Sequence, residues 1–209
     1  MSKDLVIVFV KNAIPGKVKT RLAKTIGNQA AFEVYNKLVE ITEKAIQNLN
    51  IDKRIYFSDA IVESEWVNNY KDIQKGKDLG ERMKNAFLEG FLDGYKNIIL
   101  IGSDLPDISA YQIEKALSTL QQTDTVFGPA QDGGYYLIGL SKMVETAFNN
   151  KPWSQNNLLE ETLKDLTKNN ITFSTLETLN DIDTFEDLKA SKFYKSNKVL
   201  QEKIKALYD

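Results

Sequence analysis

The fold of this chain is constrained most by three almost uninterrupted apolar runs: VIVFV (6–10), NIILIG (97–102) and YYLIGL (135–140). A short continuous apolar run bounded by polar segments is typical of a strand that is buried on both faces. Strands of this kind occur in parallel sheets whose two faces are covered by helices. The runs therefore predict a central, largely parallel sheet.

Helical patterns lie between these strands. Apolar residues recur at helical spacing in 21–49, which predicts one or two helices, and in 79–92. A further helix is expected from Ser109, which has capping-box spacing to Gln112. The other expected elements are strands at 54–58, 125–128 and 171–176, a helix at 158–166, two short helices near the C-terminus and an irregular excursion at 149–157. This alternation predicts a three-layer α/β sandwich, in one domain over residues 1–209.

The C-terminal segment 195–209 also has helical spacing of its apolar residues, which are Val199, Leu200, Ile204 and Leu207. An apolar stripe of this kind must be covered by another surface. We expect the segment to close the core of the same chain. Pairing with another subunit is the alternative.

The composition excludes several kinds of chemistry. The chain has no cysteine and no histidine, so disulfides, thiol nucleophiles, Ser-His-Asp triads and histidine-ligated zinc sites are excluded. Its net charge of −2 creates no general attraction for nucleic acid or anionic lipid. No stretch is long and apolar enough to span a bilayer, so we expect a cytoplasmic protein. Catalysis would have to use carboxylates, Lys, Arg, hydroxyls or a hard metal ion.

A cationic loop follows the first predicted strand. Lys11, Lys17, Lys19 and Arg21 surround the turn at Pro15-Gly16. Ligands of open α/β sheets collect at the carboxyl ends of strands, and clustered cations at a helix start suit a phosphate group. The loop matches neither the Walker pattern nor G-x-G-x-x-G. The alternative is a basic loop that only contributes to solubility.

Acidic residues follow two other predicted elements. Asp104 comes directly after the strand at 97–102, and Asp183 precedes a helix that Thr184 and Asp187 are suited to cap. Mg²⁺ and Mn²⁺ need only one or two carboxylates when they also bind phosphates. Both acids could therefore hold one cation, although an Asp at a loop start often only accepts hydrogen bonds from turn amides.

The segment QDGGYY contains Asp132-Gly133-Gly134 directly before a predicted strand. Asp-Gly is first of all a turn signal. The two glycines would also let the backbone approach a ligand closely. Trp153 lies in a polar segment, where it would be either a platform for a sugar or a hydrophobic plug.

Taken in chain order, five segments resemble one known family. They are KNAIPGKVKTRLA, QKGKDLGERMKNAF, LIGSDLPDI, GPAQDGGYYLIGL and DIDTFEDL. The combination resembles the bacterial GT-A-fold, nucleotide-diphospho-sugar transferase-like proteins of the DUF2064 family, which are related to 2-phospholactate guanylyltransferase. The resemblance extends to about residue 188. It implies an enzyme with a Rossmann-like GT-A sheet that binds a nucleotide and Mg²⁺ or Mn²⁺ at its carboxyl edge.

The resemblance also implies roles for individual residues. Lys19 and Arg21 look like phosphate-binding residues, in a nucleotide-binding loop that includes Lys11 and Gly16. The residues expected to read the nucleobase or to face the sugar or acceptor are Gln74, Gly80, Gly133 and Gly134. The first loop departs from the G-x-G-[ST]-R pattern of sugar pyrophosphorylases.

The resemblance implies a metal site as well. Asp104 matches the principal metal-binding acid, and Asp183 matches the late acid that completes the site. The chain has D-x-x-D, formed by Asp104 and Asp107, in place of the D-x-D of many glycosyltransferases.

Three functions follow as expectations. The first is a metal-dependent transferase that uses a nucleotide-diphospho-sugar donor, with Asp132 as the carboxylate base and with Asp104 and Lys19 at the phosphates. The second is a nucleotidylyltransferase that couples an NTP to a phosphorylated small molecule and releases pyrophosphate, which needs no strong base. The third is a non-catalytic nucleotide-binding protein. The acceptor is left open in all three.

Overall fold

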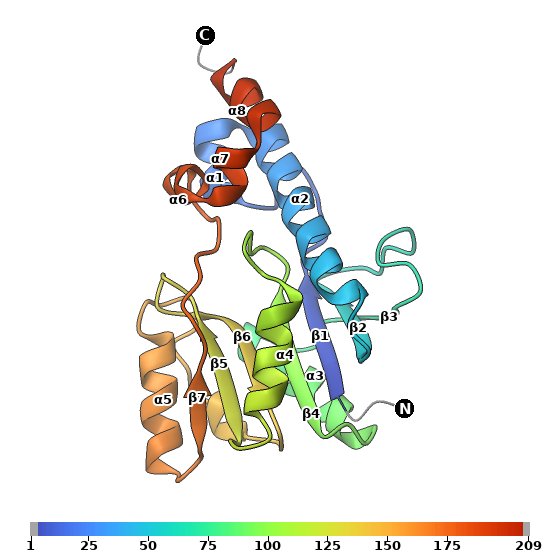
Figure 1. Ribbon diagram of the computed structural model, residues 1–209, viewed down its shortest axis with the longest axis vertical. Coiled ribbons are helices and arrows are strands. Elements are labelled where there is room, and N and C mark those ends of the chain that lie inside the picture. The colour runs from blue at the N-terminus through green and yellow to red at the C-terminus, as the bar shows by residue number, and fades with distance from the viewer. Residues whose placement is uncertain (1–3, 207–209) are drawn as a thin grey trace.

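The computed structural model describes residues 4–206 and shows one seven-stranded sheet with helices on both faces (Figure 1). The strand order is β3-β2-β1-β4-β6-β5-β7. Only β6 runs antiparallel to its neighbours, and every other pair is parallel. The strands are β1 Asp4–Val10, β2 Asp52–Phe57, β3 Tyr70–Ile73, β4 Asn97–Gly102, β5 Thr125–Pro129, β6 Tyr135–Leu140 and β7 Phe173–Thr175. The predicted mixed, mostly parallel sheet is confirmed.

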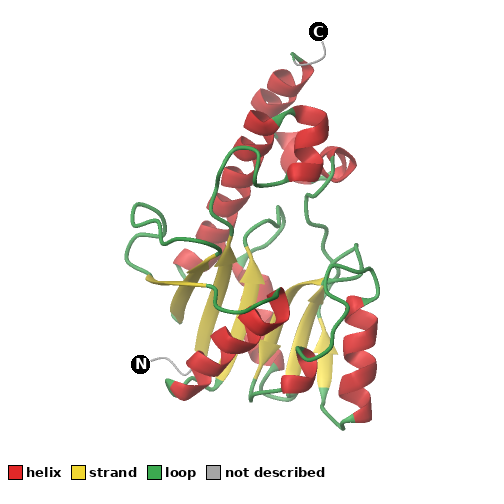
Figure 2. Cartoon of the chain, turned by 180° about the vertical axis from the view of Figure 1, so that it is seen from behind, coloured by secondary structure: helices red, strands yellow, loops and turns green. Residues whose placement is uncertain are grey.

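Side chains of β1 alternate between two separate cores, because successive residues of a strand point to opposite faces. Val6 and Val8 pack on the face covered by α2 (Asn28–Gln47) and α4 (Ala110–Thr119). Leu5 and Ile7 pack on the face covered by α3 (Leu79–Leu92) and α5 (Leu158–Lys168). All four side chains are fully buried. The apolar run in β1 is thus continuous because both faces of the strand are covered, as Figure 2 shows from behind.

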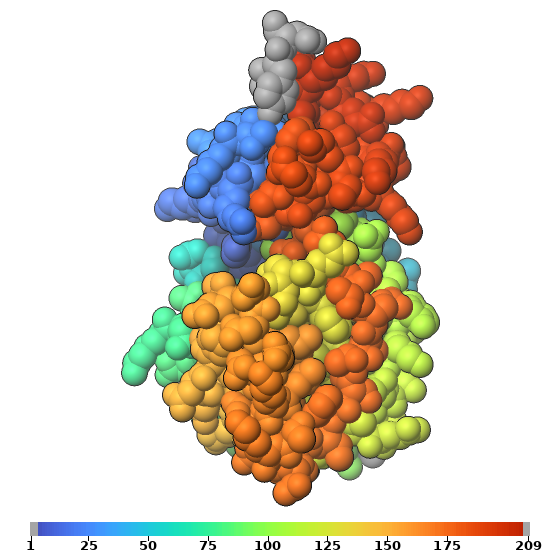
Figure 3. Space-filling view, turned by 90° about the vertical axis from the view of Figure 1, so that its left-hand side faces the viewer, coloured from blue at the N-terminus to red at the C-terminus, as the bar shows by residue number. Residues whose placement is uncertain are grey.

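A helical cap lies beyond the carboxyl end of β1. It consists of α1 (Thr20–Ile26), the first half of α2, and the C-terminal helices α6 (Phe185–Ala190), α7 (Lys192–Ser196) and α8 (Lys198–Lys205). Figure 3 shows its blue and red-orange segments packed together above the body. The buried residues that these helices share include Leu22, Ile26, Leu38, Leu188, Leu200 and Ile204. The C-terminal segment therefore closes a core of its own chain, and Leu207 lies outside the described residues.

The structure refines several element predictions. The stretch 21–49 is two helices, because Gly27 adopts φ 80° between α1 and α2. Strand β3 was not predicted, since its sequence YKDI is half-exposed at the sheet edge and has no apolar pattern. The C-terminal end has three short helices in place of two. None of the helices in residues 4–206 is long and apolar enough to cross a membrane.

The excursion at 149–157 packs against two glycines. A Cβ on Gly80, at the start of α3, would lie 2.3 Å from the ring of Trp153. A Cβ on Gly133, where φ is 88°, would lie 1.8 Å from the carbonyl oxygen of Asn156. Both glycines let another part of the same chain approach closely. Trp153 is partly buried there as a hydrophobic plug.

This packing predicts that Gly133→Ala is more destabilising than Gly94→Ala. Both residues have φ near +90°, so each substitution adds a backbone strain of about 1–2 kcal/mol. A Cβ on Gly94 meets nothing within 4 Å, whereas a Cβ on Gly133 collides with the backbone of Asn156. Urea unfolding of both variants measures the difference. Equal losses of stability would show that the 149–157 segment does not pack on this turn.

Candidate functional site

The site begins at the carboxyl ends of β1 and β4, which are neighbours in the sheet. Asp104 follows β4, and Lys19 precedes α1 at the end of the cationic loop. Lys19 is 7% exposed and has left-handed backbone angles, φ 47° and ψ 46°. Its ammonium group donates a hydrogen bond of 3.0 Å to Asp104 Oδ2. Such angles are costly for a residue other than glycine and recur at functional sites. The backbone thus directs a buried cation onto this carboxylate.

The carboxyl group of Asp104 is held in its ionised form. Burial acts to raise its pKa, but the charge and hydrogen bond of Lys19, together with the charge of Lys11, hold that pKa below the usual range. Tyr35 of α2 fixes the neighbouring backbone. Its hydroxyl accepts from the Lys11 N–H at 2.9 Å, donates to the Lys11 carbonyl at 3.1 Å and lies 3.0 Å from Ser103 Oγ. Tyr35 therefore holds Ser103, the residue before Asp104, next to the start of the cationic loop.

Asp181 is a site residue that the sequence did not identify. It lies on the segment that leads from β7 to the cap, and it shares with Asp104 the lining of a cavity of about 100 Å³. Burial raises the pKa of Asp181 to about 6, and the negative charges of Asp104 and Asp132 add to this rise, against the charge of Lys19. Two carboxylates thus face one small cavity. The sequence DID (181–183) indicates that an acid lies here, but either Asp181 or Asp183 could face the site.

Asp183 and Arg21, both predicted site residues, form a pair of their own. Arg21 Nη1 lies 2.7 Å from Asp183 Oδ2, and the two side chains are 66% and 38% exposed. The backbone N–H of Asp183 donates to Asp187 Oδ2 at 3.2 Å, next to the Thr184 cap of α6. This pair links α1 to α6 within the cap. Within residues 4–206 it forms no hydrogen bond or ion pair with Lys19 or Asp104.

Other predicted residues contact the chain itself. Gln74 donates to the carbonyl oxygens of Val10 and Tyr56 at 3.3 and 3.0 Å, so its amide joins the ends of β1 and β2. Asp132 Oδ1 accepts the Gly134 N–H at 2.9 Å within the turn. Its charge still reaches Asp181.

The glycines that were expected to contact a ligand allow a left-handed backbone or a close contact within the chain. Gly16 adopts φ 80° in the cationic loop, with the side chain of Asn28 close by, and Gly80 and Gly133 receive the 149–157 segment. The ammonium groups of Lys11 and Lys17 are exposed and form no ion pair within residues 4–206. The loop therefore retains free positive charge at the carboxyl edge of the sheet.

The acidic residues fit a cation that also binds phosphate. Within residues 4–206 no group of three or more acidic, His or Cys side chains is arranged to hold a metal ion. Asp104 and Asp181 nevertheless present hard oxygen donors to one cavity, and Lys19 occupies only Oδ2 of Asp104. Mg²⁺ and Mn²⁺ are commonly held by one or two carboxylates, with phosphates and water as the remaining ligands. The two residues suit that arrangement, and a closed protein cage is absent.

Residues 47–155 match the model of a family described as an uncharacterized protein conserved in bacteria, DUF2064. The chain belongs to this family. It is also 32% identical to a proposed nucleotide-diphospho-sugar transferase from Desulfovibrio desulfuricans G20, over 99% of this chain and 98% of that one, with a TM-score of 0.89. The resemblance seen in the five sequence segments is confirmed. A search of curated proteins gives no match.

Two more distant structures share the fold. The inositol-1-phosphate CTP transferase of T. maritima is 15% identical, with 96% of each chain covered and a TM-score of 0.57. Rv0371c of Mycobacterium tuberculosis H37Rv in complex with manganese is 13% identical, with 94% of this chain and 100% of that chain covered and a TM-score of 0.57. At these identities the likeness establishes the fold alone. The prediction of a transferase-like enzyme is confirmed by the Desulfovibrio protein, which is 32% identical and named as a transferase.

The pair formed by the buried Lys19 and the partly exposed Asp104 generates a prediction about coupling. Lys19→Met and Asp104→Asn should each destabilise the protein, and the double variant should lose less than the sum, because each single change leaves one charge without its partner. The coupling energy should lie between about 0.5 and 3 kcal/mol. Urea unfolding of the three variants and the parent protein measures it.

The matched control is the exposed pair Arg21 and Asp183, for which the coupling should stay below about 1 kcal/mol. Additive effects at Lys19 and Asp104 would contradict the electrostatic account of the site. Equal coupling in the two pairs would mean that burial of Lys19 adds nothing to the interaction.

Proposed function

We propose that this protein is a metal-dependent nucleotidylyltransferase, which couples an NTP to a phosphorylated small molecule and releases pyrophosphate. One observation carries the proposal. A buried lysine, Lys19, contacts the ionised Asp104 at the carboxyl edge of the sheet, and a second acid, Asp181, faces the same cavity. This grouping combines a fixed cation with two oxygen donors at the place where open α/β sheets bind ligands.

Each group has a part in the proposed reaction. Asp104 and Asp181 would hold Mg²⁺ or Mn²⁺. When bound, such a cation would supply positive charge and Lewis-acid chemistry at the phosphates. Lys19 would neutralise charge that develops on the α-phosphate while an acceptor phosphate attacks it. The exposed Lys11 and Lys17 would meet the departing pyrophosphate, which leaves with its negative charge compensated.

The choice between two transfer reactions depends on a base. Inverting glycosyl transfer needs a carboxylate that removes a proton from the acceptor. The candidate from the sequence, Asp132, has Oδ1 engaged by the Gly134 N–H in the turn. An acceptor phosphate is already ionised and needs no such base. Nucleotidyl transfer thus requires only the groups at the cavity, and on that ground we prefer it to the glycosyl transfer that the family resemblance favoured.

Glycosyl transfer from a nucleotide sugar is the second candidate. The observation in its favour is the 32% identity, over nearly the whole chain, to a proposed nucleotide-diphospho-sugar transferase. The two reactions release different products. Nucleotidyl transfer releases pyrophosphate from an NTP, whereas glycosyl transfer releases a nucleoside diphosphate from a nucleotide sugar.

The test begins with binding and then measures the product. NTPs and nucleotide sugars are screened by thermal shift with Mg²⁺, with Mn²⁺ and with EDTA, because a ligand that binds only the folded state raises the midpoint. Pyrophosphate and nucleoside diphosphate are then quantified with a panel of phosphorylated and sugar acceptors. We expect a metal-dependent shift with an NTP and release of pyrophosphate. Release of a nucleoside diphosphate from a nucleotide sugar would select glycosyl transfer, and binding without turnover would leave a non-catalytic nucleotide-binding protein.

Substitutions of the acids identify which pair holds the metal. Asp104→Asn and Asp181→Asn should each lower the rate by about 100-fold or more, the scale of losing one preorganised electrostatic contact. Asp183→Asn should retain most of the activity because Asp183 pairs with Arg21. Asp107→Asn is the matched control, since Asp107 is exposed and lies three residues after Asp104. A large loss in Asp183→Asn with an unchanged Asp181→Asn would restore the pair expected from the sequence.

A further inference from the structure

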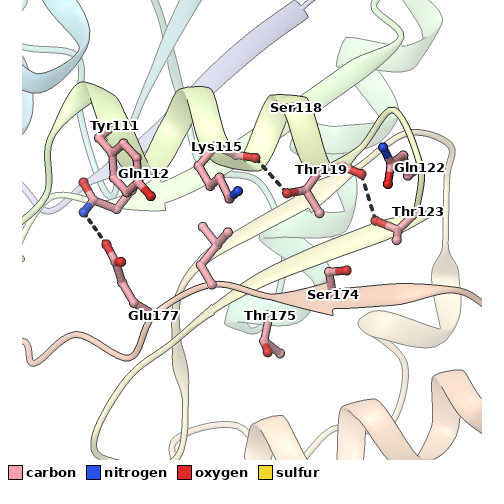
Figure 4. Close-up of a pocket in the computed structure, with 11 residues that line it drawn as sticks. Tyr111, Gln112, Lys115, Ser118, Thr119, Gln122, Thr123, Ser174, Thr175 and Glu177 are labelled. Atoms are coloured by element: carbon pink, nitrogen blue, oxygen red, sulfur yellow. Dashed lines mark hydrogen bonds between the residues drawn. The ribbon is translucent and has the colours of Figure 1, made fainter.

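We propose that a groove between α4 and β7 is a second binding site, for a carbohydrate. The groove has a volume of about 440 Å³ and lies between α4 with its C-terminal turn, β7 and the two residues after β7 (Figure 4). This volume is within the usual range of small-molecule sites, roughly 300–1,000 Å³. The proposal does not depend on the proposed transferase activity, because it concerns binding by different residues.

One wall of the groove is a polar stripe along α4. Tyr111, Lys115, Ser118 and Gln122 follow one another at steps of four, three and four residues, which places them on one side of the helix and its C-terminal turn. None of these side chains has a hydrogen bond or an ion pair within residues 4–206, and the same is true of Ser174 on β7. The ammonium group of Lys115 points from α4 toward β7 (Figure 4). The groove thus offers several free donors and acceptors to a ligand.

The end of the groove near the start of α4 is preorganised. Gln112 is 8% exposed, and its Oε1 accepts from the Ser109 N–H at 2.9 Å and from Ser109 Oγ at 2.6 Å. These bonds fix the amide, whose Nε2 donates to Glu177 Oε1 at 2.7 Å. The second carboxylate oxygen of Glu177 has no hydrogen bond within residues 4–206. A buried side chain therefore holds an acceptor in place at the groove.

The lining matches a carbohydrate. Hydroxyl and amide groups predominate, with one cation, Lys115, and one carboxylate, Glu177. A carboxylate accepts hydrogen bonds from sugar hydroxyls, and Lys115 donates to sugar oxygens. Tyr111 is 58% exposed at the same end as Glu177, where its ring gives the C–H face of a sugar an apolar surface. A nucleic acid would need a row of cations, and a multivalent anion would be repelled by Glu177.

The side chain of Tyr136 connects this groove to the acidic cavity. The ring of Tyr136 lines the cavity with Asp104 and Asp181, and its hydroxyl donates to the carbonyl oxygen of Glu177 at 3.3 Å.

The experiment uses NMR to follow the backbone amides of uniformly ¹⁵N-labelled protein. Maltose, cellobiose, chitobiose and xylobiose are each added to high millimolar concentration, without metal or nucleotide. We expect backbone amide shifts confined to residues 111–123 and 173–177 with at least one disaccharide. Glu177→Gln and Tyr111→Ala should each weaken that binding by about tenfold, since each removes one of the principal contacts. The same spectra show whether each variant is folded.

Glu114→Gln is the matched control, because it makes the same carboxylate-to-amide change on an exposed residue of α4 that does not line the groove. Its affinity for the disaccharide should equal that of the parent protein. No shift in these segments with any of the sugars, or equal affinity in Glu177→Gln and the parent, would overturn the proposal. Shifts at Lys115 with inorganic phosphate alone would also overturn it and identify an anion site.

Discussion

The ion pair between Lys19 and Asp104 connects the two packed parts of the molecule. Lys19 stands at the entrance to the helical cap, and Asp104 follows the central strand β4. The Lys19 side chain is almost fully buried, and burial of its ammonium group would be costly without a partner. The left-handed backbone of Lys19 and the anchoring of Ser103 and Lys11 by Tyr35 fix the two ends of this contact. The ion pair thus joins the cap to the sheet edge beside the continuous helix α2, which packs in both, and it also sets the charge of the site.

The sheet could be predicted from the sequence because a strand that is buried on both faces has an almost continuous apolar sequence. β1, β4 and β6 lie in the centre of the sheet, and their residues are almost all apolar. The edge strand β3 has no such apolar sequence. β3 pairs with a neighbouring strand on one side only, and none of its four residues is fully buried. Its sequence YKDI therefore shows no apolar pattern and looks like a loop. The separate core of the cap could not be predicted from the sequence either. The helical spacing of Leu200 and Ile204 shows that another surface must cover this apolar stripe, but it does not show which helices form that surface.

The site was predictable to the level of the loops but not of every side chain. Asp104 and Lys19 follow strands that are neighbours, so their loops must meet at one edge. Asp181 and Asp183 are two residues apart on an irregular segment, and nothing in the spacing tells which carboxylate turns toward Asp104. Gln74 and Gly133 looked like ligand contacts because close approach to a ligand and close approach to the chain itself require the same residue types.

The distribution of charge explains why a metal ion and a phosphate together suit this edge better than either alone. Lys19 pairs with Asp104, whereas burial and the nearby charges of Asp104 and Asp132 raise the pKa of Asp181 to about 6. A divalent cation would bring two positive charges, which is more than the one negative charge of Asp181 requires. The excess, together with the exposed Lys11 and Lys17, would be balanced by a polyphosphate. A chain with a net charge of −2 can therefore bind an anion because the positive charge is concentrated where strands end.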